Sequence, residues 1–216
     1  MDNQTRKPYK IIDSQMNGEY EEKKSRFIAT LCPVKDEEEA NAFIASMKKQ
    51  YYDARHNCSC FIIGDRGELT RSSDDGEPSG TAGKPMLEVL LGAELTYVCC
   101  VVTRYFGGVL LGTGGLVRAY SEAVKDALSN ARESGAIKTV QFCKDMKIVV
   151  SYDQVNSVLN YSARNDIQIL STEYLTEVTF QIRVLAEEYE KHFDSIIQLS
   201  QGKAKIEKMG EGFFPI

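Results

Sequence analysis

Apolar and polar residues follow one another along this 216-residue chain in patterns that change between strand spacing and helix spacing. Residues Tyr20–Cys32 mix charged side chains with a short apolar run, which predicts a strand that runs into Pro33. A helix is predicted next, because its apolar residues recur on one face: Ala40, Phe43, Ile44 and Met47. Asp36 and Glu39 have the spacing of a capping box, so this helix is expected to begin just after Asp36.

Four more elements are predicted in the first half of the chain. They are a hairpin of Asn57–Ile63 and Glu68–Arg71 around Gly64–Gly67, a short helix over Thr81–Gly92, a strand over Leu95–Thr103, and a long helix from Gly112 to Gly135. The long helix carries one apolar stripe, formed by Leu116, Tyr120, Val124, Leu128 and Ala131. This stripe predicts a helix that packs lengthwise on a sheet.

After Gly135 the pattern changes to short units of strand and helix. The predicted order is a strand over Lys138–Tyr152, a helix capped by Asp153, strands over Ile167–Leu170 and Val178–Val184, a helix around Tyr189–Ile197, and a strand over Lys203–Met209. This βαββαβ order is that of a ferredoxin-like domain. The fold class is therefore α+β with two domains, 1–134 and 137–216, and His192 is expected on the surface of its helix.

The segment Arg71–Pro85, RSSDDGEPSGTAGKP, contains three glycines, two prolines and three carboxylates and almost nothing that can enter a core. Glycine, proline and aspartate together predict a loop of definite shape. A second glycine-rich segment, Arg104–Arg118, follows the apolar run Val98–Val102. We expect the two segments to form one surface, with His56 beside them.

These segments contain residue types that bind phosphate or cations. Arg104 and Lys84 are expected to contact phosphate together with the glycine amides, and Asp74, Asp75 and Glu77 are candidates to hold Mg²⁺ or a partner's basic group. A plain turn is the alternative for 74–76. The glycine-rich helix start at 112–115 predicts either an anion site or close packing of helix on sheet.

Charge and cysteine usage limit the protein's partners and cofactors. The net charge of −5 does not favour general attraction to nucleic acid, so such binding needs a local basic groove. No signal peptide or membrane span is evident, which predicts a cytoplasmic protein without a membrane partner. The six cysteines are expected to be reduced. A metal site of His56, Cys58 and Cys60 lacks a fourth ligand, so we predict no metal and no cofactor.

Three long motifs identify a family. Residues 52–58 (YDARHNC), 71–85 and 104–112 (RYFGGVLLG) resemble, in order and spacing, the signatures of the IMPACT/YigZ family. The resemblance implies an N-terminal domain like domain 2 of ribosomal protein S5 and a C-terminal ferredoxin-like domain similar to the last domain of elongation factor G. It also implies a role in regulation of translation. Eukaryotic members restrain an initiation-factor kinase and carry an extra N-terminal partner-binding domain, which this chain is not expected to contain.

The predicted binding surface combines the family's motif positions with the glycine-rich helix start. Its residues are His56, Asn57, Arg71, Asp74, Asp75, Gly76, Glu77, Pro78, Gly80, Thr81, Gly83, Lys84, Arg104, Tyr105, Gly107, Gly108, Gly112, Thr113, Gly114 and Gly115. No catalytic residue is assigned among them.

Two functions from different classes remain open. The first is a non-enzymatic, translation-associated protein that binds RNA, the ribosome or a translation protein through the glycine-rich face. The second is a phosphate-handling enzyme, because kinases of small metabolites share the S5-like fold, although fold alone does not establish function. A hydrolase built on Ser79, His56 and Asp74 is disfavoured, because Ser79 is not in a nucleophile-elbow sequence.

Overall fold

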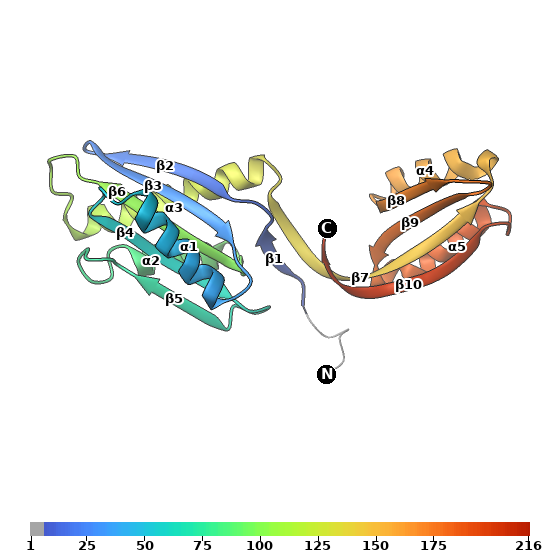
Figure 1. Ribbon diagram of the computed structural model, residues 1–216, viewed down its shortest axis with the longest axis horizontal. Coiled ribbons are helices and arrows are strands. Elements are labelled where there is room, and N and C mark those ends of the chain that lie inside the picture. Colours follow the sequence, from blue (N-terminus) through green and yellow to red (C-terminus); the bar gives the residue numbers. More distant parts are fainter. Residues whose placement is uncertain (1–6) are drawn as a thin grey trace. The chain divides into compact units, whose positions relative to one another are not determined.

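The structure is a computed structural model that describes residues 7–216, so the first six residues of the predicted domain 1–134 lie outside the described residues. The chain divides into two compact units (Figure 1). One is Tyr9–Thr139, and the other is Val140–Ile216 together with Lys7 and Pro8. The two-domain α+β class is thereby confirmed. Among the described helices, none is long and apolar enough to cross a membrane.

The first unit is built on a five-stranded antiparallel sheet with the order β2-β3-β6-β4-β5. Its strands are β2 (Met16–Glu22), β3 (Ser25–Pro33), β4 (His56–Ile63), β5 (Leu69–Ser73) and β6 (Val98–Tyr105). Its helices are α1 (Glu37–Gln50), α2 (Gly83–Gly92) and α3 (Gly112–Glu133). A short strand β1 (Tyr9–Ile12) precedes them and neighbours β7 (Ile137–Val150) in the strand order.

Helices cover both faces of this sheet, and the period-two alternation of the strands explains how. On β4, Cys58, Cys60 and Ile62 point into the main core, which α2 and α3 close. Phe61 and Ile63 point to the other face, into a smaller core under α1. The helical face predicted for α1 is confirmed, and the amide of Glu39 donates to Asp36 Oδ1 at 2.8 Å as the capping prediction required.

The prediction of one strand over Tyr20–Cys32 is wrong. The chain turns at Lys23 and Lys24, which have φ angles of 47° and 64°, and β2 pairs antiparallel with β3. Two consecutive positive φ angles make a tight hairpin turn that usually contains Asn or Gly. Two lysines carry no such signal, so the reversal is invisible in the residue pattern.

The second unit has the predicted βαββαβ order. Its elements after β7 are α4 (Val155–Arg164), β8 (Gln168–Tyr174), β9 (Val178–Leu185), α5 (Tyr189–Leu199) and β10 (Lys205–Pro215), with single 3₁₀ turns before α4 and α5. The strands are antiparallel in the order β8-β9-β7-β10, which is the ferredoxin-like arrangement. Alternate residues of β9 are buried, as the alternation predicted.

Two details of this unit differ from the predictions. Gln154, not Asp153, is the N-cap of α4, because a 3₁₀ turn occupies the preceding residues. His192 is only 2% exposed, so its predicted surface position is wrong. It lies on the buried face of α5 with Tyr189 and Ile196, and its Nδ1 is 2.8 Å from the Tyr161 hydroxyl. That hydrogen bond satisfies the ring nitrogen in the core.

The hydrophobic cores of the first unit share no residue with the core of the second unit among the residues described. The ranges 1–134 and 137–216 remain our prediction for the parts that fold separately.

Candidate functional site

The loop between β5 and α2 has a definite shape because Asp74 organises it from within. Its carboxylate accepts hydrogen bonds from the amides of Gly80, Ala82 and Gly83 at 2.8 to 3.0 Å. Partial burial raises the pKa of Asp74, but the three amide donors outweigh it and hold the pKa below its ordinary value of 3.8. The carboxylate therefore holds the first turn of α2 against the loop.

Asp75 joins the same loop to the start of β4. Its Oδ2 accepts from the amide of Asn57 at 2.7 Å, and its Oδ1 accepts from Lys48 Nζ at 2.5 Å. The carbonyl oxygen of Asp75 lies 2.9 Å from His56 Nδ1. These bonds bring His56 beside the loop.

Glu77 and Arg104 form a buried ion pair beneath the loop. Arg104 Nη1 donates to Glu77 Oε1 at 2.6 Å, and the Tyr120 hydroxyl donates to the same oxygen at 2.8 Å. The side chain of Arg104 is 8% exposed, and its guanidinium carbon lies 5.5 Å from the centre of the Phe27 ring. Arg104 was predicted as a free phosphate contact. Its guanidinium instead pairs with Glu77 inside the protein, because β6 places Arg104 opposite Phe27 of β3.

All three carboxylates of the loop accept bonds from donors of the chain itself. This favours the plain-turn alternative for 74–76 over a set of free Mg²⁺ ligands. No group of three or more metal-ligating side chains occurs within residues 7–216. Cys58 and Cys60 lie on the core face of β4, and all six cysteines are free thiols.

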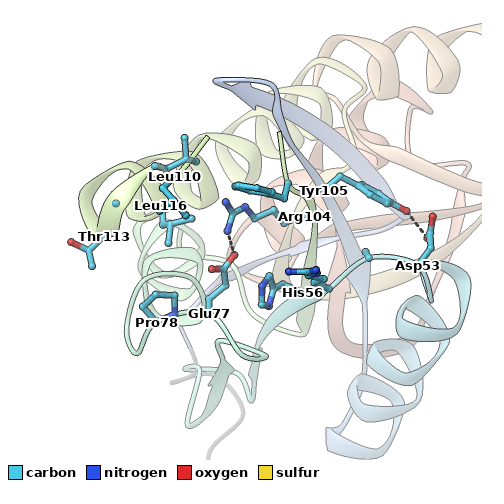
Figure 2. Close-up of a pocket in the computed structure, with 14 residues that line it drawn as sticks. Asp53, His56, Glu77, Pro78, Arg104, Tyr105, Leu110, Thr113 and Leu116 are labelled. Carbon is cyan, nitrogen blue, oxygen red and sulfur yellow. Dashed lines mark hydrogen bonds and ion pairs between the residues drawn. The ribbon is translucent and has the colours of Figure 1, made fainter. Parts of the chain in front are cut away.

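A pocket of about 610 Å³ opens next to the Arg104–Glu77 pair (Figure 2). Seven predicted site residues line it: His56, Glu77, Pro78, Arg104, Tyr105, Gly112 and Thr113. They come from all three motif segments. In Figure 2, the Arg104 side chain extends from β6 and a dashed line joins its guanidinium to Glu77, whereas Leu116 and Thr113 lie farther along on α3, with the Thr113 side chain directed away from Arg104.

The remaining predicted residues are placed around the pocket or away from it. Arg71 is exposed on β5 and lines a separate depression of about 310 Å³ beside α1. Gly83 and Gly107 have structural roles, because a Cβ would lie 2.7 Å from the backbone of Ser73 and 2.1 Å from that of Lys24, respectively. Lys84 is exposed on α2 but does not line either pocket.

Several pocket residues were missed by sequence reasoning: Asp53, Arg55, Phe106, Leu110, Leu111 and Leu116. Five of these six lie inside the motifs, and Leu116 was predicted on the apolar stripe of the long helix. Phe106 is 54% exposed and Leu110 is 84% exposed, which is unusual for such large apolar side chains in neighbouring positions. That exposure is seen only in the fold, where both side chains line the pocket.

The first turn of α3 forms one wall of the pocket. Gly112 has a φ of 72° and begins the helix, and no side chain caps the free amides. A Cβ at Gly112 or Gly114 would meet no atom within 4 Å. At these two glycines the alternative of close helix packing is therefore not supported. Only Gly115 approaches another residue, since its Cβ would be 3.0 Å from Leu111 Cβ.

Comparisons with known proteins agree with this architecture. The model of the Impact N-terminal domain matches residues 23–128, and that of a domain of unknown function (DUF1949) matches residues 148–203. The IMPACT family member YvyE of Bacillus subtilis (strain 168) is 39% identical over 188 residues, covering 87% of this chain and 84% of the relative. The IMPACT family member YigZ of Escherichia coli (strain K12) is 34% identical, covering 85% of this chain and 89% of the relative.

A solved structure described as the crystal structure of a hypothetical protein is also similar. It has a TM-score of 0.58 and 32% sequence identity, with 94% of this chain and 98% of that chain covered. The relatives, the two domain models and the motifs around the pocket all lead to one conclusion. The chain is a member of the IMPACT family.

Proposed function

We propose that this protein is a non-enzymatic, translation-associated regulator that binds RNA, the ribosome or a translation protein through the pocket face. One observation carries the proposal. Residues from three motif segments that are distant in the sequence, His56, Glu77 and Arg104, line one open pocket with the start of α3. The link to regulation of translation comes from the resemblance of these motif segments to the IMPACT family.

The chemistry of the pocket supports binding rather than catalysis. Glu77 accepts bonds from Arg104 and Tyr120, so its carboxylate is held as a structural anion and not as a free base. Burial raises the pKa of the nearby Cys58 thiol to about 12, although a hydrogen bond with Tyr120 lowers it. A thiol that stays protonated is a poor nucleophile.

A Ser79-His56-Asp74 hydrolase is likewise not supported by the geometry. The Asp74 carboxylate accepts hydrogen bonds from three backbone amides. His56 Nδ1 pairs with the carbonyl oxygen of Asp75 instead of with a carboxylate. A catalytic triad needs a carboxylate that orients the histidine ring.

A phosphate-handling enzyme remains the second candidate, because the uncapped start of α3 lines the pocket as a phosphate site does. It differs from the first proposal in requiring turnover. Incubation with ATP and Mg²⁺, alone and with ribosomes, is expected to give no more phosphate release than a sample without the protein. Turnover that is lost on Thr113→Glu substitution would instead support the enzyme.

Co-sedimentation with purified bacterial ribosomes and with total RNA tests the first proposal. The informative variants are Arg55→Glu and Leu110→Asp, since both side chains are exposed and line the pocket. Both should reduce co-sedimentation at least fivefold. Lys203→Glu and Lys205→Glu are matched controls on exposed positions of the other unit and should leave it within twofold. Equal losses from the controls, or no binding by the wild type, would contradict the proposal.

A further inference from the structure

We propose that the pocket binds a single nucleotide unit, with its phosphate between the first turn of α3 and Arg104 and its base against Phe106. This inference rests on the proposed function and names the chemical group that the pocket face takes from its partner. Four features of the described residues support it: an unsatisfied arginine, an open helix start, the local charge balance and an exposed aromatic wall.

Arg104 has hydrogen-bond donors that are not paired within the described chain. A guanidinium carries five N–H groups, and within residues 7–216 the side-chain hydrogen bond of this one runs from Nη1 to Glu77. Its Nε is buried and has no hydrogen-bond partner within the described chain. Buried polar groups in proteins are normally paired, so an exception needs an explanation. A ligand oxyanion in the pocket that Arg104 lines, met after a small shift of the side chain, supplies the missing acceptor.

The start of α3 faces the same pocket through Gly112 and Thr113. The helix is 22 residues long, its first turn contains no acidic residue, and no side chain occupies its N-cap bond. Free amides and the positive end of the helix dipole together favour a bound phosphate. Because a Cβ at Gly112 or Gly114 would meet open space, a ligand has room to approach the backbone closely.

The local charge balance suits one phosphate and not a long chain of them. Two cationic side chains, Arg55 and Arg104, and two anionic side chains, Asp53 and Glu77, line the pocket. Asp53 accepts from the Tyr105 hydroxyl at 2.8 Å, and Glu77 is paired with Arg104. The helix start adds a further partial positive charge. A protein with a net charge of −5 offers little to an extended phosphate backbone, but this pocket can hold a single group.

The rest of the pocket is apolar and can hold a base. Phe106 is half-exposed and its ring lies 5.7 Å from the Arg104 guanidinium carbon, so one end of the pocket combines an aromatic face with a cation. Leu110, Leu111 and Leu116 continue the apolar wall. Bases stack on such aromatic faces irrespective of sequence. The volume of about 610 Å³ is within the range of small-molecule sites.

A nucleotide unit has two sources, a free mononucleotide and a nucleotide at the end of an RNA strand. Isothermal titration calorimetry with the full-length protein separates them. The probes are the four ribonucleoside 5′-monophosphates, the corresponding nucleosides, and a five-nucleotide RNA with a 5′-phosphate or a 5′-hydroxyl. We expect the phosphorylated form of at least one probe to bind about tenfold more tightly than its dephosphorylated form, as one charge-assisted contact provides.

Thr113 offers a variant that changes the site and not the fold. Thr113→Glu places a negative charge in the first turn of α3, where it favours the helix but repels phosphate. We expect at least tenfold weaker binding, with an unchanged or raised melting temperature. Thr113→Gln introduces a side chain of nearly the same shape as glutamate but without the charge. This variant should bind the phosphorylated probe within about twofold of the wild type. Arg104→Lys keeps the charge and removes the planar donor fork, so it should also weaken phosphate binding.

The outcomes distinguish this inference from the proposed function. Binding of free monophosphates identifies a mononucleotide site, and binding of the 5′-phosphorylated RNA alone identifies an RNA end. If no phosphorylated probe binds, or Thr113→Glu binds as well as Thr113→Gln, the nucleotide site is refuted. Ribosome co-sedimentation that still depends on Arg55 and Leu110 would then indicate a protein partner at the same face and leave the proposed function standing.

Discussion

At the scale of single residues, the loop between β5 and α2 is shaped by the acidic side chains that the sequence analysis considered as ligands of Mg²⁺ or of a partner's basic group. Asp74 and Asp75 bond to backbone amides, and Glu77 neutralises a buried arginine. An acidic residue next to glycine has the same signature whether it binds a cation or organises a turn. What distinguishes the two is the presence of amides within reach, which depends on the path of the whole loop.

Asp74→Asn is expected to lower the free energy of unfolding by about 1–2 kcal/mol at pH 7, because charge-assisted bonds to amides are weakened. The folded-state pKa of Asp74 lies below the ordinary value of 3.8. Its ionisation therefore stabilises the fold fully above that pH, and the contribution is lost as the pH falls through the folded-state pKa.

Urea unfolding of both proteins between pH 2 and pH 7 measures this effect. The difference between wild type and Asp74→Asn should be constant above about pH 5 and shrink in acid. A difference that does not change with pH would show that the carboxylate charge is not what holds the loop.

At the scale of elements, α3 is the part that connects packing with the site. Its middle lies directly on β2, where a Cβ at Gly18 would come 2.1 Å from the amide nitrogen of Ala127. In its first turn, a Cβ at Gly112 or Gly114 would meet no atom within 4 Å. One helix thus has a tightly packed body, which fixes its position, and an open end, which lines the pocket.

Substitution of two glycines by alanine should have opposite effects on stability. Gly18→Ala forces α3 and β2 apart and should cost about 1–3 kcal/mol or more. Gly114→Ala adds a methyl group in open space at a helical position, so it should stabilise the protein by up to about 1 kcal/mol. Midpoints of urea unfolding measure both, and a loss of stability in Gly114→Ala would contradict the open helix start.

At the scale of the whole molecule, the chain contains two units with separate cores. We expect limited trypsin digestion to cut first near the joint, after Arg132 or Lys138, and to leave one fragment of each unit. Cooperative cores resist cleavage because opening them exposes buried surface. Lys138→Gln is the control and should remove the second of these cuts. Early cleavage inside both cores would argue against domains 1–134 and 137–216 as separately folding parts.

The candidate site was predictable only in part. Of the residues predicted from the motifs and the glycine-rich helix start, seven line one pocket, and their role in binding stays a prediction: His56, Glu77, Pro78, Arg104, Tyr105, Gly112 and Thr113. Phe106 and Leu110 were missed because apolar residues after a buried strand normally predict core, and only the path of the loop shows that they are exposed. The burial of Arg104 was missed for the reverse reason, since its partner Glu77 is 27 residues away.

The sequence by itself determined the order of the elements from α1 onward, the two-domain α+β class and the family. Hydrophobic periodicity, caps and long motifs are local properties, and they survive without knowledge of distant contacts. Tertiary structure alone decided which charged side chains form ion pairs inside the protein and which donors stay unpaired. The pair of Arg104 and Glu77, for example, forms only when β6 and the loop between β5 and α2 come together. It also decided that His192 is buried, since Tyr161 offers its hydroxyl from another helix.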